Sequence, residues 1–239
     1  SGCGKTTLMR MVNAMVTPTS GRVFVRGEDV AGEDPVRLRR SIGYVLQEGG
    51  LFPHRSIADN IATVPRLEGA TKQTSRERAL ELLELVGLDR EMADRYPAQL
   101  SGGQRQRVGV ARALANRADI LLMDEPFGAL DPIVRAELQC ELKEIQRALG
   151  TTILFVTHDV DEAFTLGDQV AVLSTGGRIE QVGTPTELLS SPESSFVAEF
   201  VGASRAARPV HVAGPDGLVV DDAGTPVGTL TTDEAGERP

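Results

Sequence analysis

The sequence predicts an α/β fold in which a mainly parallel sheet carries helices on both faces. Three observations lead to this prediction. Apolar runs of strand length alternate with longer amphipathic stretches along most of the chain. A glycine-rich turn precedes a helical pattern at the start of the chain, and two carboxylates, Asp124 and Glu125, directly follow one short apolar run.

The expected elements follow in order along the chain. Strands are predicted at 22–26, 41–46, 119–123, 152–156, 169–174 and 178–182. Helices are predicted at 6–16, 75–86, 104–116, 133–149 and 160–165. The helix at 133–149 has one apolar stripe, which is typical of core packing. The stretch 51–99 has no strand pattern and is expected to be mainly helical. Within it, Thr74 and Glu77 fit a capping box and Gly87 fits a helix stop.

The first eight residues match the second half of the phosphate-binding pattern G-x-x-x-x-G-K-[ST]. Small residues at Gly2 and Gly4 allow backbone N–H groups to point at phosphate oxygens. Lys5 is expected to bind the β- and γ-phosphates, and Thr6 is expected to offer its hydroxyl to Mg²⁺. The alternative is a glycine-rich turn that precedes a lysine by chance. The opening glycine of the pattern would lie before Ser1, so the chain is expected to be a fragment that lacks the preceding strand.

The run Ile120–Pro126 consists of four apolar residues, two carboxylates and a proline. A short apolar run bounded by a breaker indicates a buried strand, and ligands of open α/β sheets bind at the carboxyl ends of strands. Asp124 is therefore expected to hold Mg²⁺ and Glu125 to face the attacking water. The alternative is an acidic first turn of a helix.

Residues Leu100–Gln104 precede a helical pattern with apolar residues on one face. Ser101 and Gln104 fit a capping box, so the motif could be only a well-capped helix after a glycine turn. Its spacing from the other motifs of the chain makes it informative about the family. Together with the phosphate loop, Gln47, the carboxylate pair and His158, it resembles the ATP-binding subunits of ABC transporters. The resemblance covers residues 1–203.

This resemblance implies a role for each matching position. The nucleotide would be held by residues at the chain's start, which are Ser1, Gly2, Cys3, Gly4, Lys5, Thr6 and Thr7, and by the signature residues Ser101, Gly102, Gly103 and Gln104. Asp131 would join them from the loop that connects the two subunits. The metal ligands would be Thr6, Gln47 and Asp124. The catalytic residues would be Glu125 as general base, with Gln47 and His158 as γ-phosphate sensors. A lone histidine is otherwise an ordinary surface residue.

The resemblance also implies partners and cofactors. ATP and Mg²⁺ would bind between two cassettes that face head to tail, in a homodimer or with a paralogue. The signature motif of one cassette would contact the γ-phosphate held by the other. Two membrane-spanning permease subunits and an extracytoplasmic substrate-binding protein would complete the transporter, with this chain at the cytoplasmic face of the membrane.

The implied architecture is a P-loop NTPase of the ABC cassette type, 1–203, with a helical signature subdomain at about 51–103. Residues 47–54 and 60–65 resemble those of importers of quaternary amines such as glycine betaine, choline and carnitine. The alternative is a generic surface for the permease, which carries no information on the solute. The solute could then be an amino acid or another small molecule.

Composition agrees with an ATPase that has no pore of its own. The chain has 239 residues, of which 41% are hydrophobic, and no apolar run approaches the roughly 18 residues of a membrane span. A net charge of −9 argues against nucleic acid as a partner. Only two cysteines, Cys3 and Cys140, are present, which is typical of a reducing cytosol.

The tail at 204–239 is rich in Gly, Pro, Asp and Thr. Residues 218–231 predict two short strands around an Asp/Gly turn. They resemble one hairpin of a CBS regulatory domain, and a loosely docked remnant is the alternative. Two other functional classes stay open: a non-transport ABC ATPase, for which basic surfaces and coiled-coil insertions are absent, and an inactive fragment.

Overall fold

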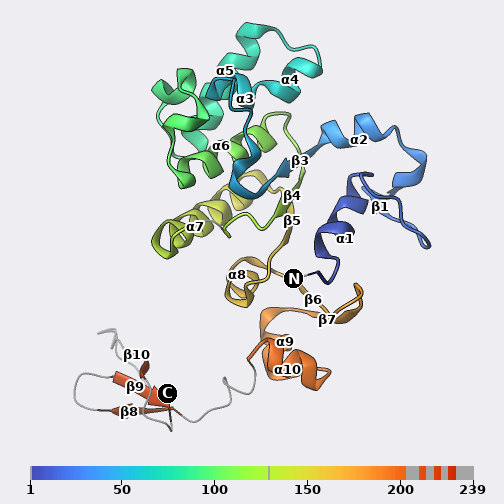
Figure 1. Ribbon diagram of the computed structural model, residues 1–239, viewed down its shortest axis with the longest axis vertical. Helices are drawn as coiled ribbons and strands as arrows, with labels where there is room; N and C mark the ends of the chain where they lie inside the picture. Colours follow the sequence, from blue (N-terminus) through green and yellow to red (C-terminus); the bar gives the residue numbers. More distant parts are fainter. Residues whose placement is uncertain (1, 129, 203–209, 214–217, 222–225, 230–239) are drawn as a thin grey trace. The chain divides into compact units, whose positions relative to one another are not determined.

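The computed structural model describes residues 2–128, 130–202, 210–213, 218–221 and 226–229 of the chain. The chain forms two compact units. One consists of Ser1–Leu166 and Leu173–Arg178, and the other of Gly167–Val172 and Ile179–Pro239. Each unit is described by itself below (Figure 1).

The first unit is built around a parallel sheet whose strands are β3 (Ile42–Val45), β4 (Ile120–Asp124) and β5 (Thr152–Val156). Their order is β3-β4-β5, so β4 lies in the centre. Ile120 pairs with Ile42 on one side and with Thr152 on the other. The parallel sheet and three of the predicted strands are thereby confirmed. The carboxyl ends of all three strands meet at one edge.

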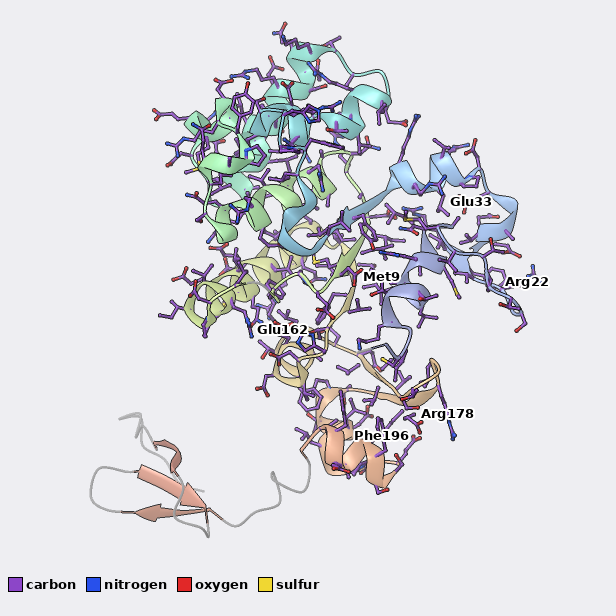
Figure 2. All side chains as sticks on the ribbon, in the orientation of Figure 1. Met9, Arg22, Glu33, Glu162, Arg178 and Phe196 are labelled. Carbon is purple, nitrogen blue, oxygen red and sulfur yellow. The ribbon has the colours of Figure 1, made fainter. Side chains whose placement is uncertain are left out.

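The two faces of β4 pack against different sets of helices. Leu121 and Met123 belong to one hydrophobic cluster, whereas Leu122 and the partly buried Ile120 belong to another. This alternation is the expected period of two for a strand that is buried on both faces. Figure 1 shows helix α1 (Lys5–Val12) on one side of the sheet and helices α6 (Gly102–Leu114) and α7 (Pro132–Leu149) on the other. Met9 of α1, labelled in Figure 2, is fully buried in the second cluster.

The stretch between β3 and α6 is helical, as predicted. It contains a 3-10 turn η2 (Gln47–Gly50), helices α3 (Ile57–Ile61), α4 (Thr63–Leu67) and α5 (Lys72–Leu85), and 3-10 turns η3 (Arg90–Asp94) and η4 (Pro97–Gln99). The predicted capping box at Thr74 is wrong, because α5 begins three residues earlier. The hydroxyl oxygen of Thr71 accepts the N–H of Thr74 and caps the helix. Gly87, with φ 67°, follows the helix end as predicted.

Two predicted helices end earlier than expected. The helix at 6–16 stops at Val12, because Asn13 leaves helical geometry and Ala14 takes a left-handed φ of 54°. The helix at 104–116 stops at Leu114, shortly before Arg117, whose φ is 53°. Left-handed residues cannot continue a right-handed helix. Neither residue is a glycine, so residue type does not mark the end of either helix.

The predicted strand 22–26 is only two residues long. β1 (Phe24–Val25) pairs antiparallel with β2 (Glu28–Asp29). The two residues between them, Arg26 and Gly27, have φ of 52° and 83°, which is the pattern of a tight two-residue hairpin. A 3-10 turn η1 (Val30–Gly32) and helix α2 (Pro35–Ser41) follow. Helix α2 was not predicted from the sequence, although Asp34 caps it and Pro35 occupies its first turn.

The remaining elements include helix α8 (Val160–Leu166), which extends the predicted helix by one residue. β6 (Val170–Leu173) pairs with β7 (Ile179–Gly183), and helices α9 (Pro185–Ser190) and α10 (Ser195–Phe200) follow. In the tail, β9 (Leu218–Asp221) and β10 (Pro226–Thr229) form the predicted antiparallel pair, and β8 (Val210–Ala213) adds a third strand. The predicted turn at 222–225 lies outside the described residues. Within the described part of the chain, no helix is long and apolar enough to cross a bilayer.

A bidentate ion pair fastens the β1–β2 hairpin to the start of the central strand. Arg26 donates from Nε to Asp119 Oδ2 at 2.8 Å and also pairs with Oδ1 of the same carboxylate. The guanidinium of Arg26 additionally donates to the Ser41 hydroxyl at 3.1 Å. The hydrogen bond from Arg26 holds the pKa of Asp119 below its ordinary value.

We expect the substitution Asp119→Asn to lower the free energy of unfolding at pH 7 by up to about 1 kcal/mol, the scale of an exposed ion pair. Because the folded pKa is depressed, the native carboxylate stabilises the fold above its unfolded pKa of about 3.9. That contribution is lost as the pH falls through the folded pKa. Urea unfolding at pH 7 and at pH 3 measures the difference.

Asp89→Asn is the control, because the exposed Asp89 side chain makes no cap bond. The explanation fails if Asp119→Asn is no less stable than this control at pH 7, or if its deficit grows on acidification.

Candidate functional site

The glycine-rich turn at the start of the chain has the geometry expected of a phosphate-binding loop. Gly2 and Gly4 have φ of 86° and 91°, a region that favours glycine. α1 begins directly after Gly4, and no side chain caps its first N–H groups. An uncapped helix N-terminus after a glycine turn is suited to an anion. Ser1 lies outside the described residues.

Lys5 and Cys3 contact one another in this loop. The Lys5 ammonium lies 3.3 Å from Cys3 Sγ. Burial raises the pKa of the Cys3 thiol, but the hydrogen bond and positive charge of Lys5 outweigh burial and leave the pKa below its ordinary value. This contact holds the Lys5 ammonium within the loop.

The helix after the loop and the end of the central strand meet through one hydrogen bond. Thr6 donates from its hydroxyl to Asp124 Oδ1 at 2.9 Å, across 118 positions of the sequence. A hydroxyl and a carboxylate in contact are the oxygen ligands that Mg²⁺ prefers. No group of three or more His, Cys, Asp or Glu side chains gathers as a metal site in the part of the chain described. Mg²⁺ is commonly held by one or two carboxylates plus substrate phosphates, so these two residues fit it.

Glu125 occupies an unusual backbone conformation beside Asp124. Its φ is 45°, in the left-handed region that costs a non-glycine residue about 1–2 kcal/mol. Its N–H donates to the Val156 carbonyl at 2.9 Å, which extends the pairing of β4 with β5 by one residue. The carboxylate oxygen Oε2 lies 3.3 Å from His158 Nδ1. Backbone strain of this kind is typical of functional positions.

The residues on either side of His158, Thr157 and Asp159, belong to a polar network that was not predicted from the sequence. Thr157 donates to Glu162 Oε2 at 2.7 Å and accepts the N–H of Asp159 at 3.0 Å. Glu162, labelled on α8 in Figure 2, is buried. Arg135 of α7 pairs with Asp159 at 3.4 Å and with Glu162 at 3.7 Å. A basic residue on the helix after Asp131 and an acidic one after His158 were the only sequence signals of this network.

The signature residues form the predicted capping box. Ser101 Oγ accepts the Gln104 N–H at 3.2 Å, and Gln104 Oε1 accepts the Ser101 N–H at 3.0 Å. A Cβ at Gly103 would lie 2.7 Å from Val134 Cγ1, so glycine allows α6 to approach α7. No hydrogen bond joins residues 101–104 to residues 2–7 in the described structure. The two motifs therefore do not form one site through hydrogen bonds within a single chain.

Asp131 also acts as a helix cap, because its Oδ1 accepts the Val134 N–H at 3.1 Å at the start of α7. Thr7 lies in the first turn of α1. Gln47 begins η2 after β3, and its side chain lies outside what the structure describes. The position of Gln47 after the carboxyl end of β3 agrees with the prediction.

The turn after Gln47 is fastened to α6. Arg112 donates to the carbonyl oxygens of Gly50 at 2.8 Å and Gly49 at 2.9 Å. Burial lowers the pKa of Arg112 from its ordinary value. A Cβ at Gly109 would lie 2.9 Å from Gly49 Cα, so the two backbones are in direct contact. Arg112 was also missed, although it interrupts an apolar helix face four residues after Val108.

A buried asparagine organises the loop at 52–56. This loop lies within the stretch 47–65, which is expected from the resemblance to face the permease. Asn60 is 0% exposed. Its side-chain amide donates to the carbonyls of Phe52, Arg55 and Ser56 at 3.1, 3.1 and 2.9 Å, and its Oδ1 accepts the Phe52 N–H at 2.7 Å. Ile61, Ala62 and Pro65 are buried as well. Packing and loop geometry thus explain much of the 60–65 motif without reference to a solute.

Residues 1–128 match the family described as ABC transporter. The chain belongs to this family. A curated relative is the glycine betaine/carnitine/choline transport ATP-binding protein OpuCA of Bacillus subtilis, 56% identical over 205 residues, which are 86% of this chain and 54% of the relative. Another is the osmoprotectant import ATP-binding protein OsmV of Salmonella typhimurium, 50% identical over 206 residues, again 86% of this chain and 54% of the relative. The chain thus spans about half the length of these relatives.

A solved structure agrees with the fold. The dimeric post-hydrolysis state of the ATP-binding cassette MJ0796, bound to ADP and Pi, matches with a TM-score of 0.67 at 33% identity. The match covers 76% of this chain and 81% of that chain. The predicted ABC cassette fold is confirmed.

We expect Asn60→Ala to lower the free energy of unfolding by roughly 2 kcal/mol or more, because it removes the four hydrogen bonds that join this fully buried side chain to the backbone of the 52–56 loop. Chemical denaturation measures the loss. Asn116→Ala is the matched control, since within the described structure the Asn116 side chain makes a single hydrogen bond, to the Arg40 carbonyl at 3.0 Å. Equal stability of the two variants would contradict the role of Asn60.

Proposed function

We propose that this chain is the ATP-hydrolysing part of an ABC importer for quaternary amine osmoprotectants such as glycine betaine. The observation that carries the catalytic part is the convergence at one sheet edge: Thr6 on Asp124 at 2.9 Å, and Glu125 beside His158 at 3.3 Å. The relatives named for glycine betaine, carnitine, choline and osmoprotectant transport support the solute class. The ATP-binding domain is proposed to span 1–203.

The proposed reaction is in-line attack of water on the γ-phosphate of ATP. Glu125 accepts the proton of the attacking water, and His158 orients the Glu125 carboxylate and contacts the γ-phosphate. Lys5 and the N–H groups at the start of α1 stabilise the negative charge on the phosphates. Residues 1–7 form the cradle around these phosphates.

Thr6 and Asp124 would hold Mg²⁺, with Gln47 as a further ligand. When bound, the ion offsets negative charge on the phosphate oxygens. In the structure the Thr6 hydroxyl donates to Asp124, and it can turn its lone pairs to a cation once that bond is released.

The nucleotide is proposed to lie between two copies of the chain, arranged head to tail. Ser101, Gly102, Gly103 and Gln104 of one copy contact the γ-phosphate held by the other, and Asp131 lies at the junction. The dimeric MJ0796 cassette supports this arrangement. Two membrane-spanning permease subunits and an extracytoplasmic binding protein complete the proposed importer, which places this chain at the cytoplasmic face of the membrane. Nucleic acid has no proposed role.

We expect Glu125→Gln to lower ATP turnover by roughly 10²-fold or more, because the amide cannot accept the proton of the attacking water. ATP-driven dimerisation is expected to persist. Steady-state phosphate release and light scattering with ATP measure the two properties.

Glu77→Gln is the matched control, since Glu77 is exposed on α5 and only accepts a bond from Gln73. Turnover of Glu125→Gln at the level of this control would remove Glu125 from its proposed role.

Uptake of labelled glycine betaine tests the solute class. The full-length protein would be placed in vesicles with its permease and binding protein, and we expect ATP-dependent uptake that is lost in the Glu125→Gln variant. Choline and carnitine serve as competing solutes. ATPase activity without uptake of any of the three would keep the catalytic proposal and overturn the solute class.

A further inference from the structure

A cavity lies outside the candidate nucleotide site, between the start of α5 and the end of α6. Its volume is about 210 Å³, enough for an ion with several waters. The polar residues that line it are Thr74, Ser75, Arg78, Asn116 and Arg117. None of them is among the residues proposed to bind ATP, so the cavity is distinct from the proposed nucleotide site.

Two hydrogen-bonding groups at this cavity are buried without a partner. Ser75 is 1% exposed, and its hydroxyl oxygen makes no hydrogen bond. The Nε of Arg78 is buried and also makes none. Leaving such a group unsatisfied costs about 1–3 kcal/mol, so native structures rarely do so. Both residues line the cavity, so a small rotation of each side chain would bring these groups to a molecule there that accepts hydrogen bonds.

The charges at the cavity favour an anion over water alone. Two guanidinium groups, of Arg78 and Arg117, line it, and no carboxylate does. Glu81 accepts a bond from Arg78 Nη1 at 3.1 Å, which engages one nitrogen of the guanidinium and leaves Nε without a partner. The exposed Arg117 side chain has no hydrogen bond or ion pair within the described structure.

The helix ends around the cavity contribute less to its charge than the two arginines do. At the N-terminal end of α5, the N–H groups of Thr74 and Ser75 already donate to the hydroxyl and the carbonyl of Thr71. At the C-terminal end of α6, the carbonyl of Leu114 accepts the Arg117 N–H at 3.0 Å and that of Arg112 accepts the Ala115 N–H at 3.3 Å. The positive field expected in the cavity therefore comes mainly from the guanidinium groups of Arg78 and Arg117.

We propose that this cavity binds a small oxyanion, a phosphate or a carboxylate group, through Ser75, Arg78 and Arg117. Guanidinium groups suit such oxygens because their donors are planar and can bind two oxygens at once. The bound anion links the first turn of α5 to the residues that follow α6, the helix that begins at the signature motif. The site is independent of ATP hydrolysis by Glu125.

Titration of inorganic phosphate tests the proposal. The full chain carrying Lys5→Ala is used, so that phosphate bound by the glycine-rich loop does not contribute, and ³¹P line broadening or calorimetry reports binding. We expect saturable binding that weakens about tenfold or more in Arg117→Gln and in Arg78→Gln, the scale of one charge-assisted hydrogen bond. Ser75→Ala is expected to weaken it several-fold.

Arg76→Gln is the control. Arg76 is the residue after Ser75, pairs with Asp94 at 2.8 Å, and does not line the cavity. Arg117→Gln changes an exposed side chain and keeps the test valid if Arg78→Gln does not fold. Absence of binding, or equal binding by Arg117→Gln and Arg76→Gln, would overturn the proposal. A parallel titration with acetate decides whether the site takes carboxylates as well as phosphate.

Discussion

The central position of β4 between two parallel neighbours is the constraint on which the site depends. Leu121 and Leu122 fill opposite hydrophobic clusters, so a shift of register by one residue would turn each cluster's side chains to the wrong face. The fixed register brings Asp124 next to Thr6, and it aligns the Glu125 N–H with the Val156 carbonyl. The positions of the carboxylates therefore follow from the packing of apolar residues several positions away.

Helix α6 joins parts of the site that lie far apart in the sequence. Its first turn packs on α7 through Gly103, and its end holds the turn after Gln47 through Arg112 and the contact of Gly109 with Gly49. The helix is internally hydrogen-bonded and short, so displacement of one end is expected to displace the other. A change at the signature motif would thus reach the end of β3 without any contact between the two motifs.

Much of the fold could be predicted from the sequence, because it depends on local patterns. The roles of the site residues were inferred from the resemblance to ABC ATP-binding subunits and stay predictions. The apolar runs before Asp124 and His158 marked strands, and Ser101 with Gln104 marked a helix start. What was missed depends on side chains meeting across the fold. Arg112 and Arg135 are surface-type residues whose partners are backbone carbonyls or carboxylates on other elements. Likewise, the left-handed backbone at Ala14 and Arg117 has no signature in residue type, so the ends of two helices were misplaced.

The left-handed backbone of Glu125 lowers the stability of the fold, but the same residue supplies the carboxylate that lies beside His158. Glycine would adopt φ 45° without the steric cost that a side chain imposes. A chain optimised only for folding would therefore carry glycine here, yet glycine has no carboxylate to place beside His158. The apolar core around β4 helps to hold Glu125 in this conformation, so substitutions in that core are expected to affect the residue to which the proposed proton transfer is assigned.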